Sequence, residues 1–374
     1  MKKQGTRLLS LLLSFAMVLG MLPAAAPHAH AAGTGEIVLT GPDGSVISAT
    51  VPPSDSGYTN EDLLAFYLNT GGTYTLTTNG TSANAVSLMV NTTDDITVVL
   101  DHVSIDVEQP KRANYYYELL NGYSPKYNPS ALEIVQADKS LTVNVELKIK
   151  GVNDLKAAAK TVTSGYEPAV LQLTGVNAVI SGYDSGDNVL NIRNGTVEGT
   201  TFSPNGIRAT NDLTLGSGVT YNIGDYSNKD ANLFIGNEGV SCSKNLVIAD
   251  GAVVNIGIDN PNGQYASCLV GKKTIGAATV NLRATYGDAI RGATVIGDGA
   301  VVTAVSDKNS AVKTADELVI GDNATVSLTS NSDDYGAVLL DSPGSFSVGE
   351  NSTVTITSKA SGKNDWAVAT DGYG

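Results

Sequence analysis

The sequence predicts an all-β protein, a right-handed parallel β-helix with three strands per coil and a helical cap at its N-terminal end. Three observations predict it: a short segment recurs along the chain, each copy reads as strand, tight turn and strand, and a third short strand precedes each copy. Repeats of about 20 to 50 residues are typical of solenoids and propellers. A propeller blade needs four strands in about 40 residues or more, and the copies here lie closer together.

The repeated segment is clearest at Ile320–Leu328, which reads IGDNATVSL. Further copies begin at Leu215, Ile248, Ile275, Ile296 and Val348. Apolar residues alternate on both sides of the turn, which is the period of a half-buried strand. The turn carries Gly-Asp-Gly or Gly-Asp-Asn, whose residues tolerate positive φ. We therefore expect the copies to stack, with Ile248, Ile275, Ile296 and Ile320 in one interior column.

The additional strand of each coil precedes the repeated segment and is therefore the first strand of the coil in chain order. It is short, with an apolar residue at its centre. It is predicted at residues 206–209, 239–242, 288–291, 310–313, 336–339 and 365–368. In a solenoid each strand pairs with its equivalent in the next coil, so the loops absorb the uneven period. Connections between parallel strands are almost always right-handed, which predicts the sense of the coil.

The first 31 residues read as an export signal. They carry no acid and three basic residues, which are Lys2, Lys3 and Arg7. An apolar run follows at 8–22, and small residues precede a cleavage point after Ala31. Because the run is shorter than the ~20 residues of a membrane-spanning helix, we expect cleavage rather than anchoring. The protein is therefore predicted to be secreted, and its net charge of −14 becomes about −17.

Residues 32–70 do not fit the repeat, and we expect them to form the N-terminal cap. Thr59 is suited to an N-cap, Glu61 and Asp62 are acids in a first turn, and the apolar residues up to Leu68 fall on one side. This predicts a short amphipathic helix that covers the open end of the solenoid. The β-helix is expected over 71–374. Since no element closes its last coil, the sequence predicts a fragment, cell-wall associated through a missing C-terminal region, or a coil left for a partner.

An insertion at 107–129 interrupts the predicted coils. It is the most aromatic stretch of the chain and contains Tyr115, Tyr116 and Tyr117 in a row. Tyrosine offers amphipathic contact area at low entropic cost, so these rings are candidates for stacking on sugar rings. The alternative is that the insertion packs its tyrosines back on the coil, although long insertions often carry function.

Histidine and cysteine are too few for several kinds of site. After cleavage His102 is the one histidine left, and its place in a strand pattern favours a structural role over a Ser-His-Asp site. Cys242 and Cys268 lie in the first strands of consecutive coils, where a disulfide is within reach. Their offsets from the following isoleucine anchors differ by one residue, so a bonded and a free state both stay open. A zinc site would have only these three residues.

Two sets of charged residues recur at fixed places in the coils. Just before the first strand lie the acids Asp288, Asp307, Asp333, Asp334 and Asp365, and just after its central apolar residue lie the bases Arg208, Arg291 and Lys313. Clustered carboxylates are what Ca²⁺ requires, so the acids are candidate calcium ligands, with turn chemistry as the alternative. The bases are candidate contacts for an acidic polysaccharide, or surface charges that contribute little.

Several segments resemble the opening of the secreted β-helix carbohydrate-binding proteins of Gram-positive bacteria. They are Gly72–Leu76 (GTYTL), Ile96–Ile105 (ITVVLDHVSI), Ser130–Ile134 (SALEI), Ser140–Val145 (SLTVNV) and Gly151–Leu155 (GVNDL). Asp288–Gly292 (DAIRG) resembles their recurrent Asp-Gly-Ile motif. The resemblance implies the fold of calcium-dependent pectate lyases, and one branch of the family binds cellulose or acidic plant polysaccharide without cleaving it. Ser310 and Gly336 replace the acid in later coils, so a full set of calcium sites is not implied.

The sequence therefore favours a secreted or cell-surface, non-catalytic module that binds polysaccharide, with Ca²⁺ as its candidate cofactor. The alternative is a lyase, with Ca²⁺ and Arg291 as base, or a hydrolase that pairs Asp288 with Asp333 or Asp334 about 5 to 10 Å away. A stalk or adhesin that binds no glycan is a third hypothesis. The negative net charge argues against nucleic acid as a partner.

Overall fold

The computed structural model describes residues 34–50, 63–107, 130–138, 140–157, 169–194, 205–224, 238–258, 266–341, 343–361 and 366–371. The predicted export signal, the tyrosines Tyr115, Tyr116 and Tyr117, and Asp365 lie outside these ranges. The described residues are all-β, as the sequence predicts for the fold class, with strands β1 to β30. They contain no helix, so they do not include the predicted helical cap. All of the strands belong to one compact unit, Thr34–Gly374.

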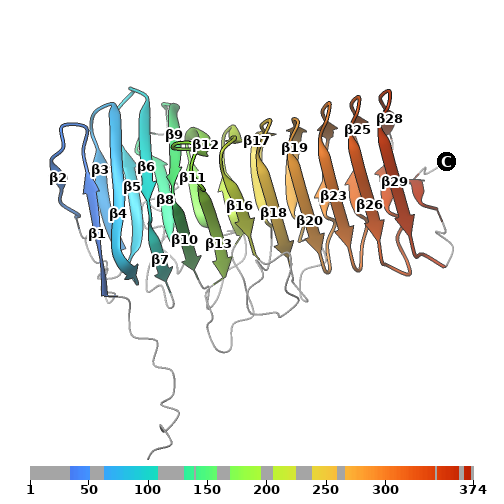
Figure 1. The fold of residues 1–374 in the computed structure, drawn as a ribbon, viewed down its shortest axis with the longest axis horizontal. Coiled ribbons are helices and arrows are strands. Elements are labelled where there is room, and N and C mark those ends of the chain that lie inside the picture. The colour runs from blue at the N-terminus through green and yellow to red at the C-terminus, as the bar shows by residue number, and fades with distance from the viewer. Residues whose placement is uncertain are drawn as a thin grey trace, which may run out of the picture. The chain divides into compact units, whose positions relative to one another are not determined.

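Strands β3 to β30 pair with one another in parallel, in a pattern that fits a β-helix solenoid (Figure 1). The pairings form three stacks of strands. The first stack contains β3 (Leu63–Leu68), β5 (Ala85–Val90), β8 (Leu132–Gln136), β11 (Ala169–Thr174), β14 (Asn205–Ala209), the first parts of β17 (Val240–Ile248) and β19 (Leu269–Ile275), β21 (Ile290–Arg291), β24 (Val312–Thr314), β27 (Val338–Asp341) and β30 (Val368–Asp371).

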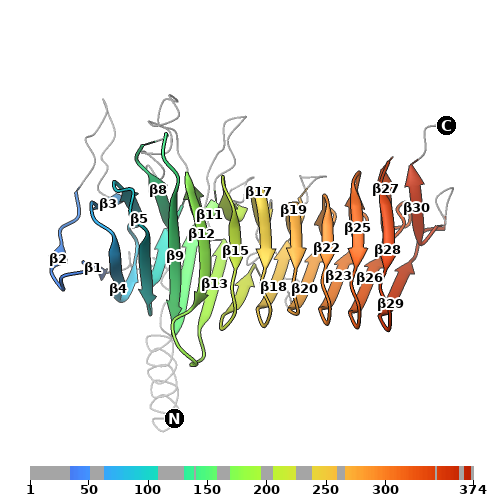
Figure 2. The same ribbon diagram turned by 90° about the horizontal axis from the view of Figure 1, so that it is seen from above.

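The second stack contains β4 (Gly72–Ser82), β6 (Ile96–Asp101), β9 (Val143–Lys150), β12 (Val176–Gly182), β15 (Leu213–Leu215), the second parts of β17 and β19, β22 (Thr294–Ile296), β25 (Glu317–Ile320) and β28 (Ser345–Val348). The third stack contains β7 (Ser104–Val107), β10 (Val152–Ala157), β13 (Val189–Asn194), β16 (Thr220–Ile223), β18 (Val253–Ile258), β20 (Thr279–Ala284), β23 (Val301–Ser306), β26 (Thr325–Ser330) and β29 (Thr353–Ser358). From β20 to β27 each strand pairs with the strand three places further on, and Figure 2 shows the successive coils of this part side by side.

The predicted interior column of the second stack is confirmed. The register aligns Ile248 with Ile275, Ile275 with Ile296 and Ile296 with Ile320. All four side chains are buried. Burying an isoleucine side chain contributes about 1.5 to 3 kcal/mol, and the column recurs in every coil along this stretch, so it is a main source of the stability of the solenoid.

The repeated turn between the second and third strands has the backbone that the sequence predicts. Asn323 and Asn351 adopt positive φ values of 55° and 56° at equivalent places. The acid of the turn then links the coils: the Asp298 carboxylate accepts the backbone N–H of Asp322 at 2.8 Å, and the Asp322 carboxylate accepts that of Glu350 at 2.7 Å. The aspartate of the repeat is thus explained by hydrogen bonds between coils.

At the N-terminal end, the helix predicted over 59–68 is wrong for Leu63–Leu68, which forms β3. This strand pairs in parallel with β5 over its whole length, and the pairing buries Leu63, Phe66 and Leu68. Tertiary pairing outweighs local helix propensity here. Two strands, β1 (Thr34–Thr40) and β2 (Val46–Ile47), pair antiparallel, and β1 also covers the free edge of β4. At the edge of β3, Ala65 forms an antiparallel bridge with Thr50.

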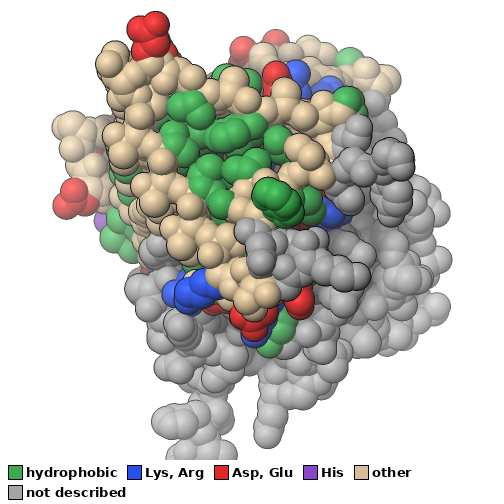
Figure 3. Space-filling model, turned by 90° about the vertical axis from the view of Figure 1, so that its right-hand side faces the viewer, with side chains coloured by type: hydrophobic (Ala, Val, Ile, Leu, Met, Phe, Trp, Pro, Cys, Tyr) green, Lys and Arg blue, Asp and Glu red, His purple; other side chains and the backbone are tan. Residues whose placement is uncertain are grey.

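At the other end of the described residues, the interior side chains of β28, β29 and β30 are only partly covered. Phe346, Val354, Ile356 and Val368 pack on the core but are partly exposed, and Val348 is 48% exposed. Figure 3 shows hydrophobic side chains gathered on this face. Among the described residues, the apolar interior of the solenoid is therefore accessible at the face formed by these three strands.

Candidate functional site

The turn that leads into the first stack carries a line of aligned residues, which we call the corner line. Because the register aligns the central apolar residues of the first-stack strands, the residues two places before them are aligned as well. These residues are Asn205, Glu238, Ser267, Asp288, Ser310, Gly336 and Trp366. Most of them are polar, and Asn205, Ser267, Asp288 and Ser310 are buried. A buried polar corner therefore follows the edge of the first stack.

Asp288 is the buried acid of the corner line. Its side chain is 2% exposed, and burial raises the pKa of its carboxyl to about 6, against the pull of the nearby Lys313 and Arg291 charges and the Ser310 backbone N–H. Its Oδ1 atom has no hydrogen-bond partner among the described residues. Buried acceptors are rarely left unpaired in native proteins, so this oxygen suggests a place for a ligand or water donor.

The bases predicted from the sequence lie in one line on the outward side of the first stack, which we call the basic line. The register runs from Arg208 through Ser241 and Val270 to Arg291, and then to Lys313 and Leu339. Arg291 and Lys313 are in adjacent coils, about 4.8 Å apart along the stack. Lys313 lies 3.9 Å from the Asp341 carboxylate, a long ion pair with both side chains part exposed. Two cations are thus placed beside Asp288.

The four predicted acids within the described ranges, Asp288, Asp307, Asp333 and Asp334, are not brought together. Asp307 follows β23 and pairs with Arg283 of the third stack at 2.9 Å, and its other oxygen accepts the Asn331 amide. Asp333 and Asp334 are exposed in the turn before β27. Of the four predicted acids that the structure describes, only Asp288 lies in the buried corner. The turns differ in length, and the strand register decides which residues align.

Calcium does not fit the described surroundings of Asp288. Ca²⁺ takes six to eight oxygen ligands, several of them carboxylates. The charges that act on Asp288 are those of Lys313 and Arg291, which repel a cation, and that of the Asp341 carboxylate. No group of three or more His, Cys, Asp or Glu residues suited to a metal occurs in the part of the chain that the structure describes.

The N-terminal part of the same outward line is buried and polar. The register continues from Arg208 to Gln172, Glu133 and Ser87, and these last three side chains are buried. Glu133 Oε1 accepts the Ser87 hydroxyl at 2.6 Å, while Oε2 has no hydrogen-bond partner in the described ranges. Burial raises the pKa of Glu133 to about 7. This buried acid could not be predicted from the sequence pattern, since strand alternation places it on the outward side.

A buried lysine stands in a second interior column, two residues before the isoleucine column. Lys273 takes the place that Leu246 and Leu318 hold in other coils. Its ammonium donates to the Arg291 carbonyl oxygen at 2.8 Å and lies 3.3 Å from the Thr294 hydroxyl. Burial lowers the pKa of Lys273 to about 7. Lys273 thus links its own coil by a hydrogen bond to the backbone of Arg291 in the next coil, where the candidate site lies.

The two cysteines are free thiols. The register pairs Val240 with Leu269, so Cys242 and Cys268 do not occupy equivalent places in their coils. Burial raises the pKa of both thiols. His102 is a turn residue with φ of 53°, and its exposed ring contacts the Asp101 carboxylate. None of the three takes part in the candidate site.

Nothing matched the chain when it was compared with models of protein families, with curated proteins and with solved structures. In the described ranges, no helix has the length and apolar character needed to span a membrane.

Proposed function

We propose that the chain is a secreted, non-catalytic module that binds acidic polysaccharide along the basic line, on a right-handed β-helix with three strands per coil. The observation that carries the proposal is the register that puts Arg291 and Lys313 in adjacent coils beside the buried Asp288. Guanidinium and ammonium groups recognise carboxylates by charge-assisted hydrogen bonds, and the guanidinium does so in a forked geometry.

The electrostatics of the chain support a specific site over general attraction. The net charge of −14 repels an acidic polymer from most of the surface. The cations of the basic line, Arg208 and then Arg291 with Lys313, give the polymer a favourable path along this side of the first stack. The export signal and the resemblance to secreted carbohydrate-binding β-helix proteins are consistent with this role at the cell wall or outside the cell, with a glycan as partner.

A lyase or hydrolase on the same scaffold is the second candidate, and Asp288 beside Arg291 is the observation that favours it. A lyase would use a basic group to remove the proton next to a uronate carboxyl. A hydrolase needs two carboxylates that flank the scissile bond, and the second candidate acids, Asp333 and Asp334, lie in an exposed turn outside the corner line. Polysaccharide binding without cleavage therefore requires fewer groups beyond the basic line than a lyase or hydrolase reaction does.

The test is native affinity electrophoresis of the mature chain in gels that contain polygalacturonate or a neutral glucan, with chelator or millimolar calcium. We expect retardation by polygalacturonate in both conditions and no rise in absorbance from unsaturated uronates in solution. Equal mobility in all gels would refute polysaccharide binding. A steady rise in absorbance that Arg291→Ala abolishes would replace the binding module by a lyase.

A further inference from the structure

A hollow of about 520 Å³ lies over β27 and β30, next to the end of the basic line. Its volume is within the range of sites that hold small ligands, which is about 300 to 1,000 Å³. Three consecutive coils supply its lining, with Ser310 from the first, Tyr335 and Leu339 from the second, and Trp366 and Ala369 from the third. The hollow is therefore formed by the same repeated corner that carries Asp288.

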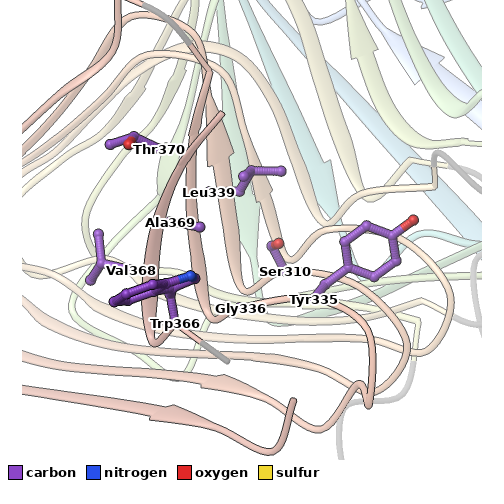
Figure 4. A pocket seen from close by; sticks show the side chains of 8 residues that line it. All are labelled: Ser310, Tyr335, Gly336, Leu339, Trp366, Val368, Ala369 and Thr370. Carbon is purple, nitrogen blue, oxygen red and sulfur yellow. The ribbon is translucent and has the colours of Figure 1, made fainter. Parts of the chain in front are cut away.

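Two exposed aromatic rings flank the hollow. Tyr335 is 43% exposed and Trp366 is 66% exposed. In the view of Figure 4 the two rings lie on opposite sides of Ser310. Large apolar rings that stay exposed together at a hollow are typical of a binding site. They present flat faces on which the apolar face of a sugar ring can pack.

A buried hydroxyl lies between these rings. Ser310 belongs to the corner line directly after Asp288, and its Oγ atom is buried with no hydrogen-bond partner among the described residues. Side chains buried this deeply almost always have a partner, so the atom points to a group that the ligand supplies. A hydroxyl of a sugar satisfies it, because a hydroxyl both donates and accepts.

The lining of the hollow is uncharged, since none of its residues in the described ranges is acidic or basic. Lys313 is the cation of the basic line nearest to the hollow. Leu339, the residue that pairs with Lys313 on the next strand, lines the hollow. A polymer that follows the basic line therefore passes from a charged part of the site to an aromatic, uncharged part within one coil.

We propose that the hollow is a stacking subsite for one pyranose ring of the bound polysaccharide, with Trp366 and Tyr335 against the ring and Ser310 bonded to one of its hydroxyls. This subsite rests on the proposed function. The subsite implies two features of the polysaccharide. One sugar unit carries a carboxylate that contacts Lys313, and a sugar unit one coil further on presents an uncharged apolar ring face.

Trp366 is the single tryptophan of the chain, so its fluorescence reports on the hollow alone. Titration with a polygalacturonate oligomer, and separately with a neutral cello-oligosaccharide, is expected to change this fluorescence to saturation for at least one of the two probes. Affinity electrophoresis in the matching polysaccharide is expected to show binding about tenfold weaker for Trp366→Ala and Tyr335→Ala, and nearly unchanged binding for Trp366→Phe.

Tyr183 provides a matched control, because it is an exposed tyrosine, 50% accessible, that lies near Lys150 in another part of the solenoid. Tyr183→Ala should bind as the unaltered chain does. Retardation of the unaltered chain with constant fluorescence, and with full retardation of Trp366→Ala, would overturn the subsite and leave the proposed function standing. Absence of retardation and of any fluorescence change would overturn both.

Discussion

Replacing Glu133 by glutamine is expected to raise the free energy of unfolding by about 3 kcal/mol at pH 8 and to leave it nearly unchanged at pH 4.5. Burial raises the pKa of Glu133 from its ordinary value of 4.5 to about 7. Between these two values the folded protein holds a proton that the unfolded chain has lost. The free energy of unfolding therefore falls as pH rises through this window, and the loss persists above it.

The measurement is urea unfolding of both proteins across pH 4.5 to 8. Glutamine has the shape of the carboxylic acid and keeps an acceptor for the Ser87 hydroxyl, so the variant isolates the charge. Glu317→Gln is the matched control, because Glu317 is exposed at the start of β25. A difference between Glu133→Gln and the unaltered protein that stays constant with pH would show that Glu133 is not buried as described.

Replacing Gly287 by alanine is expected to destabilise the protein by about 3 kcal/mol or more, the second large effect. A Cβ atom at this position would overlap the backbone carbonyl oxygen of Ala266 in the preceding coil. The obstacle is backbone of an adjacent coil, so no side-chain movement relieves it. Gly287 directly precedes Asp288, whose side chain is buried in the corner line.

Thermal unfolding of Gly287→Ala tests the expected loss, with Gly186→Ala as control. At Gly186 a Cβ would approach only the flexible end of the Asp184 side chain closely, so a change of less than about 1 kcal/mol is expected. Similar melting temperatures for the two variants would mean that the coils are not packed at the corner as the structure has them.

The stacking of coils was predictable because it depends on alternation and repetition, which the sequence displays directly. The Ile248 to Ile320 column and the positive φ at Asn323 follow from the repeat, since alternating apolar residues have one buried side and turns of this kind need particular residues. The N-terminal end was not predictable in the same way. There Leu63–Leu68 has a helical pattern of apolar residues, and only pairing with a distant strand makes it β3.

The site was predictable only where register and sequence distance agree. Arg291 and Lys313 flank equivalent apolar residues, so their alignment follows from the repeat. Asp307 and Asp333 stand in turns of different length, and no local pattern tells which of them faces the corner. The hollow at Trp366 was missed because its lining comes from three coils whose contact depends on the exact register.

The most direct test of the central claim is the effect of charge on polysaccharide binding. Arg291→Glu combined with Lys313→Glu reverses two charges on the basic line, and Lys244→Glu combined with Lys272→Glu makes the same change in net charge at exposed residues of another corner. Circular dichroism and unfolding establish that both variants fold. We expect the first pair to lose retardation by polygalacturonate, with affinity at least about tenfold lower, and the second pair to keep it within about threefold. Equal loss of affinity in the two variants, or no loss in either, would contradict a polysaccharide site on the basic line.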